Sequence, residues 1–342
     1  MDTGVVLLNF GEPERPTEDE VVPFLERIFT VNASLEGEPT PEEIRTRSRA
    51  LAERRAPGLI EEYRRIGGSP LNRQAAQQAD ALRDELARRG RSVHTYVGMQ
   101  FTRPDMADVV ARARADGVRR LVALPVYPLC GASTTVAALA ALSDAVAAAG
   151  WQVDLHEISG WHTHAVYTEL RADGIRRTAA DAGIDLDDDR VRVVFSAHGT
   201  PMKYIREGSR YDVYVRDCCR RVAAAAGVAR YDIGYQNHTN RPVEWTQPDI
   251  EKVIEEVDAD AVVVVPISFM HEQSETLAEL DVELREEAEA RGLGFHRVPV
   301  PHDDPRFAGV LADLVEERLG AEEADLYECR CRIGARCRNA VL

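Results

Sequence analysis

Residues 191–201 read VRVVFSAHGTP. Most of the first seven are β-branched or apolar, which is typical of a buried strand, and Gly199 and Pro201 then favour a sharp turn. The turn carries His198, and histidine is the side-chain type that titrates nearest neutrality. In open parallel sheets ligands bind beyond the carboxyl ends of the strands. The stretch therefore predicts a buried strand with a site at its end, although a histidine that only caps the turn is the alternative.

Similar short apolar runs recur along the chain and alternate with longer segments of helical period. This alternation is typical of a parallel sheet that helices cover on both faces. Eight strands could close a barrel, but the excursion over residues 30–72 and the break at Gly150-Trp151 favour an α/β fold of two Rossmann-like, doubly wound domains, each with a four-stranded parallel sheet, and a cleft between them. Strands are expected near residues 4–10, 92–98, 119–126, 152–157, 191–197, 230–235, 260–266 and 293–297. Helices are expected near residues 17–29, 41–54, 73–89, 105–116, 135–149, 163–182, 211–226, 248–257, 273–291 and 305–319.

The two expected domains divide the chain near residue 150. The segment 31–41 is polar and contains prolines, which predicts a mobile surface segment that could form a lid. The tail has no helical period and would stay disordered unless something tied it down. The predicted division is an N-terminal domain of residues 1–150 with a lid at about 31–60 and a completing helix at about 302–320, a second domain of residues 151–301 with His198 and Glu275, and a tail of residues 321–342.

The composition is that of an acidic globular protein. Of 342 residues, 58 are acidic and 42 basic, for a formal net charge of -16. Nucleic acid is not expected as a partner, because the phosphate backbone is held by clustered basic side chains. No run of about 18 apolar residues occurs, which argues against a membrane-spanning helix, and the first residues lack the features of a secretory leader. We therefore expect a cytoplasmic protein without stable membrane insertion.

A row of carboxylates follows the strand near 260–266. On a helix, Glu275, Glu279 and Glu283 are spaced four apart and share one face, with His271 a turn earlier. Taken alone, such a row is more often a solvated helix face than a site. Its start at a strand end favours function, because burial there would raise the pKa of the carboxyls and let them relay protons or hydrated cations.

Two loops of the first half are expected at the corresponding edge. Residues 8–13 close the first strand and residues 127–135 the third, and both offer backbone amides suited to a carboxylate or phosphate. The glycines and proline of residues 66–71 would let a flat ligand approach the backbone. Gly-rich nucleotide fingerprints are missing from the sequence, so nucleotide cofactors are not supported.

Taken together, these segments resemble the ferrochelatase family. The resemblance is collinear over residues 4 to about 300, and it implies insertion of ferrous iron into a porphyrin bound in the cleft between two Rossmann-like domains. The segments that carry it are LNFGEP at 8–13, AERRAP at 52–57, YRRIGGSPL at 63–71, YVGM at 96–99, the YP…STT loop at 127–135, FSAHGTP at 195–201, Tyr235-Gln236 with Trp245 and Pro248, and ETLAELD at 275–281.

The resemblance also implies roles for individual residues. His198 and Glu275 match the family's catalytic histidine and glutamate. Insertion must remove two pyrrole protons and bend the ring towards the metal, so His198 would accept protons or present Fe2+ while the acidic row behind Glu275 carries charge to or from solvent. The row and its neighbour are Glu279, Glu283 and His271, and the expected porphyrin contacts are Phe10, Ser69, Met99, Phe101 and Trp245, for which core packing is the alternative.

One departure from the family lies beside the catalytic glutamate. The family usually shows a histidine two residues before it, where this chain has Gln273. His271, four residues before Glu275, could still aim at the same site from one helical turn away.

Three cysteines crowd the tail, which resembles the family members that carry a 2Fe-2S cluster. The resemblance implies Cys329, Cys331 and Cys337 as ligands, with Cys130 as the internal fourth. The neighbouring arginines are expected to lower the pKa of the thiols and offset the charge of a cluster. A redox-active free-thiol tail or a zinc site is the alternative. Cys218 and Cys219, adjacent on a helix, are expected to be small buried residues.

The resemblance leaves several partners open. The porphyrin is coproporphyrin III or protoporphyrin IX, and the charged residues 31–48 favour the more carboxylated coproporphyrin because they would be costly to immerse in a bilayer. A haem-accepting protein is a further expected partner. The competing hypotheses are a chelatase for another metal and tetrapyrrole, such as cobalt, and a non-catalytic porphyrin, haem or cluster-sensing protein.

Overall fold

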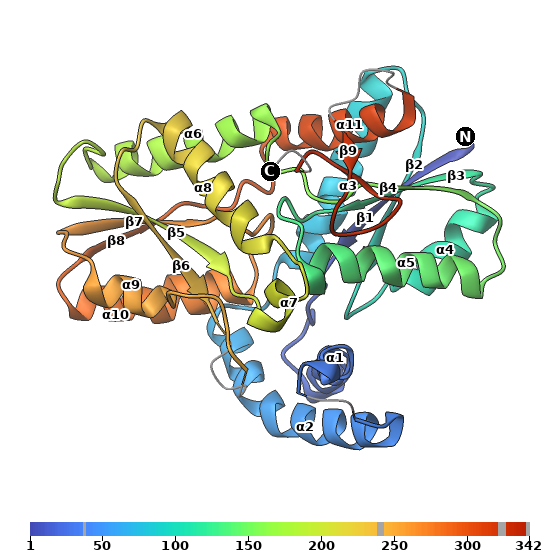
Figure 1. Ribbon diagram of the computed structural model, residues 1–342, viewed down its shortest axis with the longest axis horizontal. Coiled ribbons are helices and arrows are strands. Elements are labelled where there is room, and N and C mark those ends of the chain that lie inside the picture. The colour runs from blue at the N-terminus through green and yellow to red at the C-terminus, as the bar shows by residue number, and fades with distance from the viewer. Residues whose placement is uncertain (37–38, 238–242, 321–325, 340–342) are drawn as a thin grey trace.

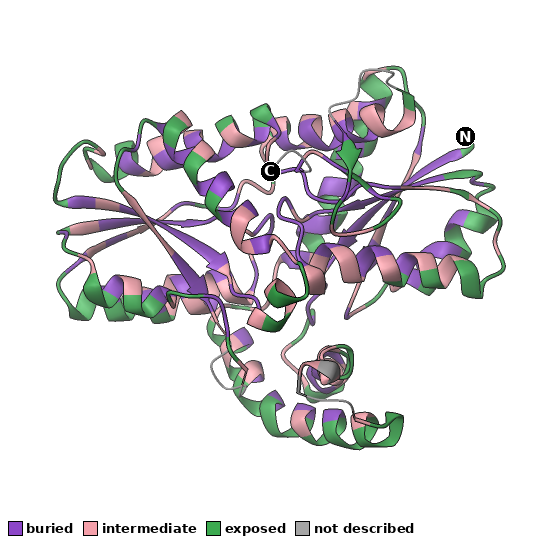
Figure 2. Ribbon diagram, in the orientation of Figure 1, coloured by how far each residue is buried: buried purple, intermediate pink, exposed green. Residues whose placement is uncertain are grey.

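The computed structural model describes residues 1–36, 39–237, 243–320 and 326–339, and it consists of two α/β bodies with a helical hairpin projecting from one side (Figure 1). Each body contains one four-stranded parallel sheet with helices on both faces. The predicted fold class is therefore confirmed. Figure 2 shows that the strands are buried, whereas much of the projecting hairpin is exposed.

The two sheets have the same strand order, β2-β1-β3-β4 and β6-β5-β7-β8, with every neighbouring pair parallel. In each sheet the connections from the two central strands leave in opposite directions, which opens a crevice beyond their carboxyl ends. All eight strands lie close to the predicted ranges. They are β1 (Thr3–Asn9), β2 (His94–Met99), β3 (Arg120–Pro125), β4 (Asp154–Glu157), β5 (Val191–His198), β6 (Tyr231–Gln236), β7 (Ala261–Pro266) and β8 (Gly294–Arg297).

Helices cover both faces of each sheet (Figure 1). The short helix α7 (Met202–Arg206), directly after β5, was not predicted. The first sheet is covered by α3 (Leu71–Arg88) and α11 (Pro305–Gly320) on one face and by α4 (Met106–Ala115) and α5 (Ala137–Ala148) on the other. The second is covered by α6 (Ala165–Ala182) and α8 (Tyr211–Ala226) on one face and by α9 (Ile250–Glu256) and α10 (Arg285–Ala290) on the other.

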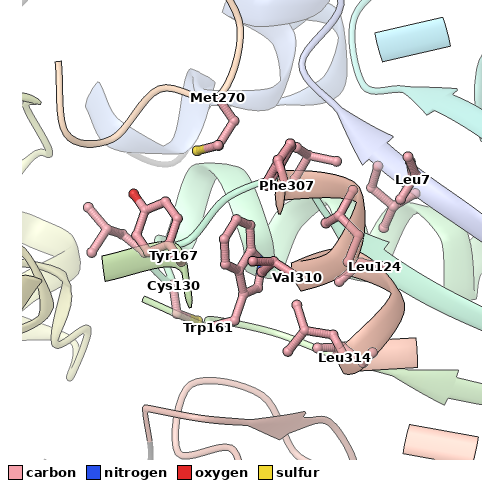
Figure 3. Packing of buried hydrophobic residues seen from close by; sticks show 14 of the residues in the cluster. Leu7, Leu124, Cys130, Trp161, Tyr167, Met270, Phe307, Val310 and Leu314 are labelled. Carbon is pink, nitrogen blue, oxygen red and sulfur yellow. The ribbon is translucent and has the colours of Figure 1, made fainter. Parts of the chain in front are cut away.

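The last helix, α11, packs against both bodies. It contacts α3 and β3 in the first and α6 in the second. Figure 3 shows Phe307, Val310 and Leu314 of α11 among the buried residues, and the ring of Phe307 lies 5.9 Å from that of Trp161, centroid to centroid. All of these side chains are at most 1% exposed, so α11 joins the two bodies through one continuous core.

The projecting hairpin consists of α1 (Glu18–Val31), the short 3₁₀ helix η1 (Ala33–Glu36) and α2 (Pro41–Arg65). The sequence predicted that the second helix would end near residue 54, but it continues through Pro57 to Arg65. Its buried residues recur about every four positions and pack on α1, and this tertiary contact outweighs the helix-breaking tendency of proline. The mobility predicted for residues 31–41 stays a prediction, and residues 37–38 lie outside the described residues.

Two helical segments have the wider π geometry, with i→i+5 hydrogen bonds. They are η2 (Ala132–Val136) and η3 (Glu275–Leu284), and each follows the third strand of its sheet. The sequence predicted ordinary helices over 135–149 and 273–291, so this part of the prediction was wrong in detail. Four-residue spacing is compatible with both helix types, which is why the pattern could not distinguish them.

The tail is tied to the body over residues 326–339. Its strands β9 (Tyr327–Glu328) and β10 (Arg336–Cys337) pair as a hairpin, and β10 extends the edge of the first sheet by bridging Ile158. The Ser159 amide donates to the Arg336 carbonyl at 2.7 Å. Residues 321–325 and 340–342, which also belong to the predicted tail, lie outside the described residues.

Among the residues that the structure describes, no helix has the length and apolar character needed to cross a membrane.

Candidate active site

His198 is the last residue of β5, and its backbone is held on both sides. Its amide donates to the Ser268 hydroxyl at 2.8 Å, and its carbonyl accepts from the Tyr211 phenol at 2.9 Å. The imidazole Nδ1 lies 2.6 Å from the Gly199 carbonyl, which can only accept, so Nδ1 carries the proton and Nε2 is the basic nitrogen. The side chain is partly exposed, and the turn therefore presents a base at the crevice of the second sheet.

The residue after His198 must be a glycine. A Cβ atom on Gly199 would lie 2.8 Å from the Gln236 carbonyl oxygen and within bonding distance of the Asn237 side chain. The Gly199 amide uses this close approach to donate to the Gln236 carbonyl at 2.7 Å. The tight contact joins the turn after β5 to the end of β6.

Gln236 connects the histidine turn to the carboxylate row. Its Oε1 accepts from the buried Ser196 hydroxyl at 2.8 Å, while its Nε2 donates to the Glu275 carbonyl and to Glu279 Oε2, each at 2.8 Å. Gln236 is 3% exposed and is paired in register with His198. In the sequence, Gln236 stands out only within the resemblance to the family, because a bridging amide leaves no local pattern.

The row Glu275, Glu279 and Glu283 lies on η3 and leads outwards. The first two residues are partly buried and the third is exposed. Desolvation, and then repulsion from Glu275, hold the pKa of the Glu279 carboxyl well above its ordinary value. Glu62 of α2 belongs to the same acidic group, because burial and then the charge of Glu283 raise the pKa of its carboxyl.

Glu12, in the loop after β1, is a second acid of the first half in this acidic group. It is 2% exposed and accepts hydrogen bonds from the hydroxyls of Tyr63, Ser69 and Ser274. Burial and the charge of Glu275 raise the pKa of its carboxyl to about 7. The sequence indicated a role only for the backbone amides of this loop. The role of the Glu12 carboxylate was not predicted, because its partner Ser274 is distant in the chain.

His271 does not lie on the helix that carries the row. It sits in a bend before η3, is 5% exposed, and its Nε2 lies 2.7 Å from Gln78 Oε1 on α3. Burial, with the nearby His302, lowers the pKa of its imidazole to about 3. The shared face predicted for His271 and the row was therefore wrong, because the helix begins too late to include it. Gln273, where the family has a histidine, donates to Glu275 Oε2 at 2.7 Å instead.

The side chains predicted to contact a porphyrin differ in exposure. Phe10 is partly exposed, and its ring centroid lies 4.6 Å from that of Phe101. Phe101 and Met99 are 3% and 2% exposed, and Phe101 packs in the cluster that anchors α1 and α2. Trp245 is 9% exposed and bridges to Pro201 beside the histidine turn. Core packing accounts for the burial of Phe101 and Met99, and the porphyrin contacts stay a prediction.

The family model that describes ferrochelatases matches residues 2–319 of this chain. The chain belongs to the ferrochelatase family. Membership makes it an enzyme that inserts iron into a porphyrin in haem biosynthesis. A ferrochelatase from Synechococcus sp. (strain RCC307) is 37% identical over 95% of this chain and 84% of its own length. One from Thermosynechococcus vestitus is also 37% identical, over 97% and 87%.

A comparison of solved structures supports the fold alone. The structure described as SirB from Bacillus subtilis with Fe3+ aligns with a TM-score of 0.54 and 11% sequence identity, covering 95% of this chain and all of that one. The two-body architecture is thus a known chelatase arrangement.

The tail of this family member meets Cys130 at a second group of reactive side chains. The sulfurs of Cys130, Cys329 and Cys331 lie within 4.8 Å of one another. Cys337 lies outside this set of three but interacts with Cys329. The thiols of Cys130, Cys331 and Cys337 hold the pKa of the Cys329 thiol well below its usual range. The Ser159 hydroxyl also donates to Cys329 Sγ at 3.0 Å.

Two arginines of the tail form ion pairs with acids of the body. Arg332 forms ion pairs of 2.6 Å with both oxygens of Glu157, and Arg338 pairs with Glu317. These pairs attach the tail to the body, and Cys329 also acts electrostatically on Arg332, so the effect of the arginines on the thiols stays a prediction. The sequence predicted their proximity to the thiols but could not show the acids from distant segments.

Cys218 and Cys219 stay outside the thiol group. Both are fully buried on α8, and burial raises the pKa of their thiols, that of Cys218 to about 12. Their structural assignment as small buried residues agrees with the prediction.

Proposed function

We propose that this chain inserts Fe2+ between His198 and the carboxylate row that begins at Glu275. The observation that carries the proposal is the bridge through Gln236, whose backbone holds the His198 turn and whose side chain holds Glu275 and Glu279. A base and a row of acids, far apart in sequence, are thereby placed at the end of one sheet. Iron is the substrate of the reaction, and the porphyrin is the second substrate.

In this proposal His198 accepts the protons that metallation releases, and the carboxylate row carries them away. Metallation releases two pyrrole protons, and His198 Nε2 is the basic nitrogen that accepts them in turn, because Nδ1 is engaged by the Gly199 carbonyl. The row supplies the exit. Burial and the charge of Glu275 raise the pKa of the Glu279 carboxyl, and exposure increases from Glu275 to Glu283, so the row is suited to pass protons or hydrated cations to solvent.

The porphyrin is proposed to lie against the face that carries Phe10, Ser69 and Trp245, with Met99 and Phe101 supporting it from beneath. Phe10 and Trp245 offer aromatic surface from the first and second body, respectively. Charged residues on α2, such as Arg49 and Glu53, form exposed ion pairs on the hairpin. This polar surface supports coproporphyrin III rather than protoporphyrin IX as substrate, and a cytoplasmic enzyme.

The test is an insertion assay with purified protein, ferrous iron and each porphyrin in turn. The variant His198→Ala should lower kcat by about 100-fold or more, the usual worth of a general base. His94→Ala is the matched control, because His94 begins β2 in the first sheet, whereas His198 ends β5 in the second. An unchanged rate in His198→Ala contradicts the mechanism, faster turnover of protoporphyrin IX or of cobalt contradicts the substrate assignment, and binding without turnover makes the chain a carrier.

We also propose that the thiol group holds a 2Fe-2S cluster through Cys130, Cys329, Cys331 and Cys337. Three sulfurs within 4.8 Å of one another, a fourth thiol that interacts with Cys329 and a hydroxyl donor beside Cys329 suit an iron–sulfur cluster, which would supply a redox-active inorganic centre when bound. In this proposal the chain's own part is to hold the tail hairpin against residues 158–160.

Visible absorbance tests the cluster. The protein purified without oxygen should show iron–sulfur bands that Cys329→Ser removes, together with bound iron and sulfide measured chemically. Cys219→Ala is the matched control, because Cys219 is buried on α8 away from the thiol group. Bound zinc without the bands, or free thiols that react fully with a thiol reagent, would contradict the proposal.

A further inference from the structure

Helix α8 carries two buried tyrosines on one face. Tyr211 and Tyr214 are three residues apart, which places them side by side on the helix, and they are 6% and 1% exposed. Their hydroxyls serve different parts of the molecule. Tyr211 bonds the backbone of His198, and Tyr214 lies beside Cys331 of the tail. One rigid helix therefore touches both the proposed catalytic turn and the thiol group.

The contact at Tyr211 fixes the orientation of His198. Its phenol donates to the His198 carbonyl at 2.9 Å, and on the other side the His198 amide donates to Ser268 at 2.8 Å. These two bonds hold the peptide planes that flank the His198 Cα atom, and thus the direction in which the imidazole leaves the chain. Tyr211 does not need to touch a substrate for this purpose.

The contact at Tyr214 joins the same helix to the tail. The Tyr214 hydroxyl lies 3.7 Å from Cys331 Sγ. The ring of His162 packs 5.6 Å from that of Tyr214, centroid to centroid, and His162 Nε2 bonds Asp217 one turn further along α8 at 3.1 Å. His162 follows Ser159 and Gly160, the residues on which the tail docks. The tail and its docking segment therefore both rest on α8.

Cys130 provides a second connection between the thiol group and this helix. The next residue, Gly131, faces the ring of Tyr211, because a Cβ atom there would lie at ordinary contact distances of 3.5 Å and 3.8 Å from two of its carbons. The loop that supplies Cys130 thus packs on the tyrosine that holds His198. Cys130 and Cys331 both act electrostatically on Tyr214, while Gly131, the residue after Cys130, faces Tyr211.

We propose that Tyr211 is a positioning residue for His198, and that α8, through Tyr211 and Tyr214, couples the order of the His198 turn to closure of the thiol group by a bound metal or cluster. A bound group fixes Cys130 and Cys331 relative to each other. The loop before Gly131 and the tail beside Tyr214 then hold α8 from both sides. This inference rests on the proposed role of His198.

Hydrogen exchange measured by mass spectrometry tests the coupling without reference to activity. In the metal-loaded full chain, the amides of residues 199–206 should exchange slowly. Tyr211→Phe keeps the ring packing and removes one hydrogen bond, so exchange there should rise about fivefold, the change in local opening expected on losing one such bond. Cys331→Ser should raise exchange of the same peptide, as should Tyr214→Phe to a smaller extent. Tyr327→Phe, on the exposed strand β9, is the control that should change nothing.

Steady-state kinetics separate positioning from general stability. Tyr211→Phe should lower kcat about tenfold at an unchanged KM for porphyrin, and it should displace the pH profile of kcat, because the imidazole no longer has one fixed orientation. A loss of thermal stability with an unaltered pH profile and an unaltered exchange pattern would overturn the positioning role.

The coupling itself has a separate outcome. If exchange over residues 199–206 is the same in Cys331→Ser and in the unaltered chain, the thiol group does not act on the turn. His198→Ala keeps these two proposals distinct. Retained iron insertion in that variant removes the proposed function, whereas its exchange response to Cys331→Ser still reports whether α8 connects the two places.

Discussion

The two halves of the molecule share one scaffold and differ in chemistry. Their sheets have the same strand order, and in each a π-helical segment follows the third strand. In the first half this segment, η2, reads ASTTV and carries no charge. In the second half the corresponding η3 reads ETLAELDVEL and carries four acids. The scaffold therefore sets where a site can form, while the sequences of these segments decide which half provides the ionisable groups.

The crevices repeat the same division. The second half contributes His198 and the acidic row, whereas the first half contributes the aromatic Phe10 and the thiol of Cys130. Glu12 and Glu62 are the exceptions, because Glu12 reaches from the first half to Ser274 at the start of η3 and Glu62 of α2 feels the charge of Glu283. The first half therefore adds a buried acid to the second half's row. The following predictions test this division, beginning with the largest expected effect.

Neutralising the first acid of η3 should be the most damaging change. Glu275→Gln keeps the shape and removes the charge, so kcat for iron insertion should fall about 1000-fold, within the range for a general acid or base. Folding should be retained, and the rate should be measured under iron-saturating conditions. Glu287→Gln, on the exposed face of α10, is the control. If kcat fell only twofold in Glu275→Gln, the charge on η3 would not be needed for catalysis.

The buried acid of the first half should reveal itself in the pH dependence of stability. The pKa of the Glu12 carboxyl is about 7 in the folded chain, compared with 4.5 for an ordinary glutamate. The folded state thus binds more protons between these values, and the contribution of Glu12 is fully present below pH 4.5 and is lost as the pH rises through 7. The free energy of unfolding of the wild type should therefore fall, relative to that of Glu12→Gln, by about 3 kcal/mol from pH 4 to pH 8.

Urea unfolding at each pH measures this difference. Glu14→Gln is the control, because Glu14 lies two residues along the same loop and is exposed. A difference between wild type and Glu12→Gln that stays constant with pH would show that the Glu12 carboxyl does not have the raised pKa.

The contrast between the two halves also explains how far the sequence could be interpreted. Apolar runs and turn residues depend on local order in the chain, so all eight strands and the position of His198 at a strand end were predictable. The bridge through Gln236 and the hydrogen bonds of Glu12 were not, because they join residues that are distant in sequence and whose types are common on any surface. The thiol group was predictable in part. The close spacing of its three tail cysteines predicted it, whereas the acids that pair with Arg332 and Arg338 come from distant segments and were not predictable.

The π segments mark a further limit. A four-residue repeat of Glu275, Glu279 and Glu283 is satisfied by an α-helix and by a π-helix, so periodicity cannot choose between them. The late start of η3 could not be predicted from the sequence either. His271 lies before the helix and bonds Gln78 of α3, a contact between segments that are distant in the chain. Tertiary contacts, rather than local propensity, decided both points.

The smallest expected effects come from a matched pair of buried threonines, one in each π segment. Thr135 donates to the Leu129 carbonyl at 3.3 Å, whereas Thr276 donates to the Gln273 carbonyl at 3.1 Å and accepts from the Gln273 amide at 2.9 Å. Replacement by valine keeps the volume and removes the hydroxyl. With one bond lost in Thr135→Val and two in Thr276→Val, unfolding free energies should fall by about 1 and about 2 kcal/mol.

The rates of this pair sharpen the comparison further. Gln273 bonds Glu275, so Thr276→Val should also slow iron insertion, by about tenfold if the loosened side chain misplaces the carboxylate by a fraction of an ångström. Thr135→Val should leave the rate within about twofold, because η2 carries no charged side chain. Chemical unfolding together with the insertion assay on both variants measures each part. If both variants lose the same rate, both π segments position catalytic groups. The proposed difference between the uncharged first half and the charged second half would then be wrong.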